Sequence, residues 1–346
     1  DVYKRQGVPR RERACRALIL RHLSALRSGR LAIVDVDGVH RVGSGDDSQR
    51  EARLIVKQPR FYSRTVFGGS LAAAESYLQG EWDSDDLLGL MRLLGREDNE
   101  CSKLERGFAE LMRPGRAAWN WLKRNTRAGS RRNIAAHYDL SNDFFELMLD
   151  TTMTYSGGIF ETADATLEAA SRAKYDRICR KLALRPQHHI VEIGTGWGGF
   201  ACHAARNYGC RVRSTTFSQE QYDFAVNRIQ ELGLSNRITV LLQDYRDLRG
   251  SFDRLVSIEM IEAVGHRFLG TYFAKCCQLL KPDGMMALQA ITIPDERYDV
   301  YRRNVDFIQK YIFPGGCLPS FSSMTSAVKR GTDFRLVHSE DFAEHY

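Results

Sequence analysis

The sequence predicts an α/β fold in which a doubly wound parallel sheet follows a smaller mixed α/β domain. From about residue 134, apolar stretches that suit strands alternate with stretches of helical spacing, a pattern typical of parallel sheets with helical crossovers. A glycine-rich turn separates the first of these strands from the next helix. The length of 346 residues suits two domains at roughly 150 residues per domain.

The predicted N-terminal domain spans residues 1–112 and mixes helices with strands. A basic segment of helical character precedes a hairpin over residues 31–42, in which Asp37 and Gly38 form the turn. No window approaches the roughly 20 apolar residues of a membrane span, and no apolar signal segment opens the chain. The other expected elements are a strand and two helices, at residues 52–57, 71–78 and 87–94.

Residues 113–133 predict a basic linker between the two domains. Residues 113–132 carry arginine and lysine but no acid, with Trp119 and Trp121 interleaved. A solvated linker fits this pattern, and so does a segment that lies on lipid with its indoles at the headgroup level. The net charge of +7 favours a polyanionic partner, either nucleic acid or an acidic membrane surface.

The C-terminal domain, residues 134–346, predicts parallel strands with helices between them. Helices are expected from Gly199 and over residues 219–232, and residues 281–284 are expected to turn before the last strand. Strands are expected at residues 188–193, 211–216, 238–242, 252–258 and 284–291. Ligands of such sheets bind outside the carboxyl ends of the strands. The residues expected around that crevice are Glu192, Thr216, Asp244 and Glu259.

The turn after the first of these strands is rich in glycine. Gly194 suits a tight turn, Gly196 lets a ligand approach the backbone, and Gly198 and Gly199 let the helix start close to the sheet. Residues 194, 196 and 199 also match the GxGxxG pattern of dinucleotide sites, which is a weak signal alone.

The acids near this loop favour S-adenosylmethionine over a dinucleotide. Glu192 stands just before the first glycine, as in methyltransferases. A dinucleotide fold instead needs an acid at the end of the second strand, where residues 214–218 have none. A nicotinamide or flavin cofactor and a purely structural turn are the alternatives. Asp244 is expected to bind the adenine amino group or, alternatively, to cap a helix.

A nucleic-acid methyltransferase would use the same fold. Many such enzymes grip a flipped base with a proline-containing loop after the fourth strand. Residues 257–262 contain no proline, so the sequence argues against nucleic acid as a partner.

Several motifs occur in an order that is similar to one known family. The chain resembles cyclopropane-fatty-acyl-phospholipid synthases and the related mycolic-acid methyltransferases. The resemblance implies a Rossmann-like class I methyltransferase sheet with S-adenosylmethionine as the cofactor. The motifs are at residues 136–145, 153–156, 191–199, 216–221, 243–248, 259–265 and 311–320.

The resemblance also implies how the cofactor is held. Tyr155 and Ser156 would close over its methionine part, and the loop from Gly194 to Gly199, with Thr195 and Trp197, would carry it. Thr216 and Gln221 would bind the ribose in place of the missing acid. Asp244 and Tyr245 would flank the adenine.

The activity that the resemblance implies is methyl transfer to the double bond of an unsaturated phospholipid acyl chain, followed by proton removal and closure of a cyclopropane ring. A bound bicarbonate is the implied base, and its implied ligands are Glu262, Tyr346, Ile291, Gly157 and Gln289. Gly157 replaces a cysteine of the family and Gln289 replaces a histidine. Glutamine cannot be protonated, so a methyl-branched or methylene product is the alternative.

The sequence leaves two possible roles open for each of two further residues, Cys317 and His137. Cys317 matches a cysteine once favoured as catalytic, but a thiolate has no evident step in alkene methylation, and a structural turn is the other interpretation. His137 either orders the loop that carries Tyr138 and Asp139 or acts as a base.

The expected partners are unsaturated phospholipids and an anionic membrane surface, with a homodimer left open. The scattered cysteines predict free thiols in the cytoplasm, so we expect a peripheral protein at the inner face of the membrane. No metal site is expected. A non-catalytic lipid-binding module and a methyltransferase for small diffusible molecules are the rival hypotheses. The chain lacks an initial methionine and stops abruptly, so a truncated C-terminus is expected.

Overall fold

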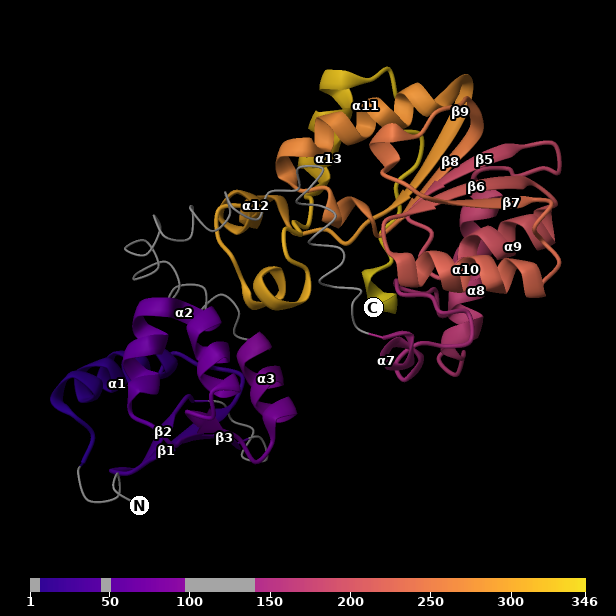
Figure 1. Ribbon diagram of the computed structural model, residues 1–346. Helices are drawn as coiled ribbons and strands as arrows, with labels where there is room; N and C mark the ends of the chain where they lie inside the picture. The colour runs from indigo at the N-terminus through magenta and orange to yellow at the C-terminus, as the bar shows by residue number, and fades with distance from the viewer. Residues whose placement is uncertain (1–6, 45–50, 97–140) are drawn as a thin grey trace. The chain divides into compact units, whose positions relative to one another are not determined.

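The computed structural model describes residues 7–44, 51–96 and 141–346. The chain forms two compact units, one at the N-terminal side and one that contains the long parallel sheet (Figure 1). The domain limits expected near residues 112 and 133 lie outside the described residues, as does the basic segment between them. Those limits therefore stay a prediction.

The N-terminal unit is a mixed sheet covered by helices, as the sequence predicts. The strands follow the order β2-β1-β3-β4, in which β1 pairs antiparallel with β2 and parallel with β3. Its strands are β1 (Arg30–Asp35), β2 (Gly38–Val42), β3 (Glu51–Val56) and β4 (Trp82–Asp83). Its helices are α1 (Arg10–Leu23), α2 (Arg60–Leu78) and α3 (Leu87–Arg96). A core that includes Leu31, Tyr62 and Trp82 holds them together.

The hairpin of this unit turns one residue earlier than the sequence predicts. Asp35 pairs with Gly38, so Val36 and Asp37 form the turn and Gly38 opens β2. The side chain of Asp35 accepts a hydrogen bond from the N–H of Asp37 at 2.9 Å. This bond closes the turn on Asp35, which the Asp-Gly pattern alone does not reveal.

The second unit confirms the predicted doubly wound sheet. Five parallel strands follow the order β7-β6-β5-β8-β9. The chain therefore builds one half of the sheet and then returns past β5 to build the other half. The strands are β5 (His189–Ile193), β6 (Arg211–Thr216), β7 (Ile238–Leu242), β8 (Phe252–Ile258) and β9 (Leu280–Gln289).

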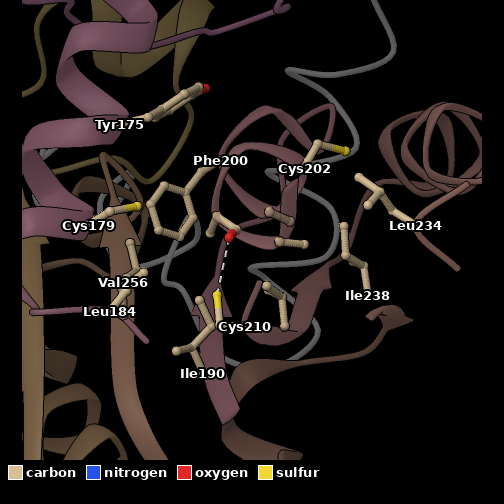
Figure 2. Close-up of a cluster of buried hydrophobic side chains, with 14 of the residues drawn as sticks. Tyr175, Cys179, Leu184, Ile190, Phe200, Cys202, Cys210, Leu234, Ile238 and Val256 are labelled. Atoms are coloured by element: carbon tan, nitrogen blue, oxygen red, sulfur yellow. Dashed lines mark hydrogen bonds between the residues drawn. The ribbon is translucent and has the colours of Figure 1, made fainter. Parts of the chain in front are cut away.

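Helices cover both faces of this sheet (Figure 1). On one face lie α8 (Leu167–Lys181), α9 (Gly199–Tyr208) and α10 (Gln219–Glu231), and on the other lie α11 (Leu269–Leu279) and α13 (Phe321–Gly331). Figure 2 shows part of the first of these layers, in which Phe200 of α9 packs near Ile190 of β5. Ile190 and its neighbour Val191 belong to opposite layers, because successive strand residues face opposite sides. Both are fully buried, so β5 is the centre of the fold.

The last strand is longer than expected, and the predicted turn over residues 281–284 is wrong. β9 begins at Leu280, which pairs with Phe252, and its register with β8 then shifts before Met285 pairs with Arg254. The Lys-Pro-Asp-Gly stretch is therefore an irregular part of the strand. Proline is tolerated there because β9 is an edge strand.

Short helices complete the second unit. They are α7 (Asn142–Glu146), α12 (Asp295–Tyr301), the π-helical turn η5 (Ile308–Ile312) and the 3-10 turns η2 (Tyr245–Asp247), η3 (Ile261–Ala263), η4 (His266–Phe268) and η6 (Ala343–His345). Within the described ranges no helix has the length and apolar character needed to cross a bilayer. The cysteines in the same ranges are free thiols, as predicted.

Candidate active site

The glycine-rich loop connects β5 to α9 and uses backbone conformations that favour glycine. The φ angle is +99° at Gly194, +51° at Gly196 and +83° at Gly198. A Cβ added at Gly196 would meet no heavy atom within 4 Å, so the space beside this residue is open. A Cβ at Gly199 would lie 2.6 Å from the hydroxyl of Tyr175. The loop therefore combines close helix packing with an open backbone face.

Glu192 lies beside this loop and is almost fully buried, with 2% of its surface exposed. Ser214 of β6 donates its hydroxyl to Glu192 Oε2 at 2.5 Å and contacts Thr195 Oγ1 at 2.6 Å. Burial raises the pKa of Glu192 to about 8. These contacts tie β5, β6 and the loop together. A direct role for Glu192 in cofactor binding stays a prediction.

An open pocket lies at the carboxyl ends of the strands, where parallel sheets of this kind bind their ligands. Its lining includes Gly194, Thr216 and Tyr245, which are predicted cofactor residues. Phe217 and Gln243 also line it, and sequence reasoning missed them although each directly follows a strand. That position was the signal that could have identified them.

Thr216 and Gln221 are linked to each other at the start of α10. Thr216 Oγ1 donates to Gln221 Oε1 at 2.8 Å, and both side chains are buried. Ser218 caps α10 by accepting the N–H of Gln221 at 3.2 Å. Of the two side chains predicted to replace a ribose acid, Thr216 lines the pocket and Gln221 holds it in place.

Asp244 follows β7 and caps the short helix η2, the alternative that the sequence left open. The N–H and the Nε of Arg246 donate to Asp244 Oδ1 at 2.8 and 2.9 Å, and the guanidinium also reaches Oδ2. The Nε of Arg246 also lies 2.9 Å from Oδ2, so Arg246 engages both oxygens of the carboxylate, and a contact of Asp244 with adenine stays a prediction. The open backbone face at Gly196 and the pocket fit an adenosine-bearing cofactor.

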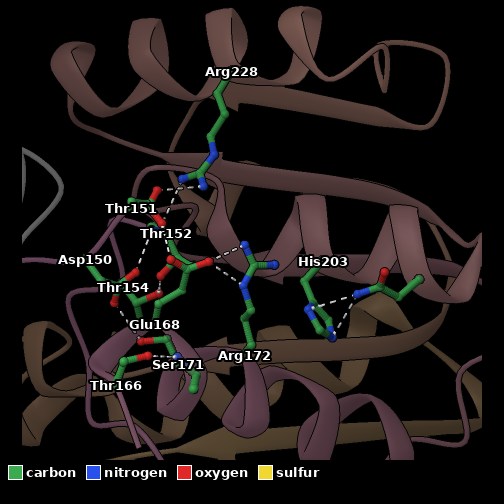
Figure 3. A network of polar contacts seen from close by, with 12 residues as sticks. Asp150, Thr151, Thr152, Thr154, Thr166, Glu168, Ser171, Arg172, His203 and Arg228 are labelled. Atoms are coloured by element: carbon green, nitrogen blue, oxygen red, sulfur yellow. Dashed lines mark hydrogen bonds and ion pairs between the residues drawn. The ribbon is translucent and has the colours of Figure 1, made fainter.

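Hydrogen bonds connect the segment before α8, at residues 151–154, to α10 and to α8 itself. Arg228 of α10 donates to the carbonyl oxygens of Thr152 and Thr151 at 2.7 and 3.1 Å (Figure 3). Thr152 Oγ1 contacts Thr154 Oγ1 at 2.5 Å, and Thr154 Oγ1 contacts the hydroxyl of Tyr175 at 2.6 Å. These bonds fix the backbone that leads into the site.

Tyr155 lies in an aromatic cluster. Its ring centroid is 5.3 Å from that of Phe145, 6.5 Å from that of Trp197 and 6.5 Å from that of Phe313. Trp197 is 2% exposed and donates its indole N–H to Asn142 Oδ1 at 2.8 Å. The cluster provides an apolar wall beside the glycine loop, which suits a reaction that must exclude water.

Ser156 accepts a hydrogen bond from a buried lysine. Lys174 of α8 is 1% exposed, and its Nζ donates to Ser156 Oγ at 2.5 Å. Burial lowers the pKa of Lys174 to about 8, although the charges of Glu259 and Asp150 act in the opposite direction. Sequence reasoning missed Lys174, because a lysine within a helix carries no signal that distinguishes a buried position from a solvated one.

Gly157, Gln289 and Tyr346 meet, as the resemblance implied, but they meet on Glu259. Glu259 Oε1 accepts the N–H of Gly157 at 3.0 Å, the side-chain amide of Gln289 at 2.6 Å and the hydroxyl of Tyr346. Burial raises the pKa of Glu259, and the hydrogen bonds from Gly157 and Gln289 and the charge of Lys174 oppose that rise. The donors that were expected to hold bicarbonate thus already hold a carboxylate of the chain.

Glu262 lies beside this cluster and contacts the backbone. The N–H of Ile291 donates to Glu262 Oε1 at 2.6 Å, while Oε2 is buried and has no hydrogen-bond partner among the described residues. Burial raises the pKa of Glu262 to about 7. The N–H of Cys317 donates to the carbonyl oxygen of Glu262 at 2.8 Å. The backbone of Cys317 thus supports the turn that carries Glu262.

His137 lies outside the described residues, so both of its suggested roles stay predictions. The motif over residues 136–145 is described only from residue 141 onward.

Residues 125–346 match the family model described as mycolic acid cyclopropane synthetase. The match covers more than half of the 346 residues. The chain belongs to this family. Membership makes the protein a lipid-modifying methyltransferase that uses S-adenosylmethionine.

Similar proteins extend the family match into the N-terminal unit. The chain is 38% identical over 325 residues to the tuberculostearic acid methyltransferase UfaA1 of Mycobacterium tuberculosis, across 91% of this chain and 74% of that protein. It is 41% identical over 284 residues to the cyclopropane-fatty-acyl-phospholipid synthase of Escherichia coli, across 81% and 70% of the two chains.

Solved structures of the family share the fold of the second unit. The cyclopropane synthase MmaA2 from Mycobacterium tuberculosis aligns with a TM-score of 0.57 at 31% identity, over 62% of this chain and 78% of that one. The mycolic acid cyclopropane synthase CmaA1 in complex with SAH and CTAB aligns with a TM-score of 0.56 at 33% identity, over 60% and 76%.

Proposed function

We propose that the protein transfers the methyl group of S-adenosylmethionine to the double bond of an unsaturated phospholipid acyl chain, and that proton loss then closes a cyclopropane ring. One observation carries this proposal: the carboxyl edge of a single sheet brings together an open pocket beside a glycine loop and a carboxylate cluster. A methyl donor and a base are the two components that such a reaction requires.

The cofactor supplies an activated methyl group when it is bound. The residues proposed to hold it are the loop from Gly194 to Gly199, the Thr216–Gln221 pair, and Asp244 with Tyr245. An alkene is a weak nucleophile, so the protein must align the reacting carbons and exclude water. The aromatic wall around Tyr155 supports that role, and its ring faces suit a cationic intermediate on the acyl chain.

A methyl-branched or methylene product is the second candidate. Two observations favour it: Gln289 replaces a histidine of the family, and a relative with 38% identity is named for tuberculostearic acid, a methyl-branched fatty acid. Both candidates share the methyl-transfer step and both lose a proton to a base, so the branched product meant here still carries a double bond; a saturated branched chain would need a separate hydride donor. They differ in whether a hydride shift precedes removal of the proton.

Expression of the protein in a bacterial host that makes unsaturated phospholipids and lacks its own synthase tests the proposal. We expect acyl chains that are heavier by one methylene group, with upfield cyclopropane protons in the NMR spectrum. Exomethylene signals, or branched-methyl signals with a remaining C=C bond, at the same mass gain would select the second candidate. Unmodified acyl chains, in cells where the protein is folded and binds its cofactor, would contradict both.

A substrate inside a bilayer requires the protein to reach the membrane surface. We therefore propose that the protein associates peripherally with anionic lipid on the cytoplasmic side, and that the N-terminal unit and the basic segment at residues 113–132 contribute to docking. The net charge of +7 supports this proposal.

A further inference from the structure

Glu259 occupies the centre of an anion-binding arrangement. Its Oε1 accepts bonds from donors on three separate parts of the second unit: the N–H of Gly157, the amide of Gln289 at the end of β9, and the hydroxyl of Tyr346. Converging N–H and O–H donors of this kind stabilise a negative charge in a site with little water. The structure therefore contains a built anion site whose occupant belongs to the chain.

The backbone of Glu259 shows that this placement has an energetic cost. Its φ angle is +46°, a left-handed conformation that costs about 1–2 kcal/mol for a residue with a side chain. The N–H of Glu259 donates to the carbonyl oxygen of Gln289 at 2.9 Å, which holds the residue at the end of β8. Glycine would adopt this conformation without strain, so the glutamate needs a reason beyond the turn itself.

Gly157 and Gln289 are both suited to a carboxylate at the position of the Glu259 side chain. A Cβ on Gly157 would lie 2.3 Å from the ring of Tyr346, so any side chain there would displace the tyrosine from Glu259. Gln289 donates a hydrogen bond without carrying a positive charge. A cation at that position would favour the ionised carboxylate and weaken it as a base.

We propose that Glu259 is the base of the reaction, and that its carboxylate takes the place which the family resemblance implies for bicarbonate. This inference rests on the proposed function. Bicarbonate does not fit this site, because the donors expected to bind it already donate hydrogen bonds to Glu259. These donors are Gly157, Gln289 and Tyr346.

The step balances without any added reactant. After methyl transfer the acyl chain carries a positive charge. A C–H bond of the transferred methyl group breaks, and its electron pair forms the new C–C bond of the ring, or the C=C bond of a methylene product. The proton moves to Glu259, which later releases it to water. Burial raises the pKa of Glu259, which improves a carboxylate as a proton acceptor.

The test measures methyl transfer to dioleoylphosphatidylglycerol vesicles in carbon-dioxide-free buffer, with and without added bicarbonate. The unaltered protein should be equally active in both. Glu259→Gln keeps the size of the side chain but removes the base, so activity should fall by about 100-fold or more, and bicarbonate should not restore it. Glu259→Gly empties the site, so a similar loss should be recovered at least tenfold by bicarbonate.

Folding and cofactor binding are checked separately. Glu259→Gly removes the left-handed strain, so its melting temperature should not fall below that of the unaltered protein. Both variants should bind S-adenosylmethionine with unchanged affinity in calorimetry. Glu161→Gln changes an exposed loop acid by the same substitution and should leave activity unaltered.

Two results would overturn the inference while leaving the proposed function intact. One is a strong dependence of the unaltered protein on bicarbonate, and the other is a Glu259→Gln variant with full activity. An unaltered protein that binds its cofactor but methylates no acyl chain would instead overturn the proposed function, and this inference with it.

Discussion

A single carboxyl group beside the glycine loop should make the stability of the second unit depend on pH. Burial raises the pKa of Glu192 to about 8, above the value of about 4.3 for an exposed glutamate. Between these values the folded state holds a proton that the unfolded state releases. The contribution of Glu192 to stability is therefore present at low pH and is lost as pH rises through this window.

The variant Glu192→Gln tests this linkage, because glutamine resembles the protonated acid at every pH. A pKa unit corresponds to about 1.4 kcal/mol, and 1 kcal/mol moves Tm by roughly 2–4 °C in a domain of this size. We expect the Tm of the variant relative to the unaltered protein to rise by at least about 3 °C between pH 5 and pH 8. A constant difference would contradict the burial argument, and Glu161→Gln is the control.

Gly196 and Gly233 form a matched pair for testing the cofactor loop. Both have a positive φ, at +51° and +66°, and a Cβ on either meets nothing within 4 Å. Alanine at each position should thus cost a similar stability, about 1–2 kcal/mol. Only Gly196→Ala should weaken S-adenosylmethionine binding, at least tenfold by calorimetry, since only that side chain faces the proposed ligand. Equal affinities for the two variants would refute the assignment.

At the residue scale, motif reasoning found the members of the site but not all of their contacts. Gly157, Gln289 and Tyr346 come together as the resemblance implied, yet their shared partner is Glu259 and not Glu262. The two acids are separated by the turn at Met260 and Ile261, and the backbone conformation of that turn decides which one points at the donors. A positive φ at a glutamate is not readable from sequence, because local preference disfavours it.

At the element scale, one arginine of α10 makes hydrogen bonds to the segment before α8, beside the apolar packing of Phe224 against the cluster that contains Met153. Arg228 donates to two carbonyl oxygens of the turn at Thr151 and Thr152. Hydrogen bonds to a charged group contribute about 1.5–3 kcal/mol. The turn leads directly into Tyr155, so its position should affect cofactor binding as well as stability.

Replacing Arg228 with methionine keeps the apolar stem and removes the donors. We expect a loss of about 2 kcal/mol in the free energy of unfolding and weaker binding of S-adenosylmethionine. Arg180→Met is the control, since its ion pair with Asp176 is solvent-exposed and should contribute less than about 1 kcal/mol. Similar losses for the two variants in denaturant titrations would show that the turn is held by other contacts.

The strands and helices were predictable wherever local pattern and long-range packing agree. The strands of the parallel sheet follow apolar runs, and β5 and β6 begin and end within one residue of the expected positions. β9 was predicted too short because proline and glycine at residues 282 and 284 indicate a turn, whereas pairing of Leu280 with Phe252 extends the strand. Pairing with a distant strand cannot be read from a local pattern.

At the scale of the whole molecule, the positive charge should make membrane association sensitive to salt. We expect the protein to float with phosphatidylglycerol vesicles at low salt and to leave them at about 1 M salt, where the Debye length is about 3 Å. Vesicles of phosphatidylcholine alone should bind less protein. Binding that is independent of lipid charge would contradict the proposed role of electrostatics.

The basic segment lies outside the described residues, so its role depends on a charge-reversal comparison. Arg131 and Arg132 changed together to glutamate should reduce flotation severalfold. The same change at Arg206 and Arg249, which are exposed in the second unit, alters net charge equally and should have a smaller effect. Equal reductions would indicate that net charge, and not this segment, attracts the protein to lipid.

The most direct test of the central claim follows the transferred methyl group itself. Purified protein is incubated with dioleoylphosphatidylglycerol vesicles and S-adenosylmethionine whose methyl group is fully deuterated, and the acyl chains are analysed by mass spectrometry. The account predicts chains that carry the transferred carbon but have lost one of its deuterium atoms, because a base removes it. Chains that keep every deuterium atom, or chains without label despite turnover of the cofactor, would contradict it.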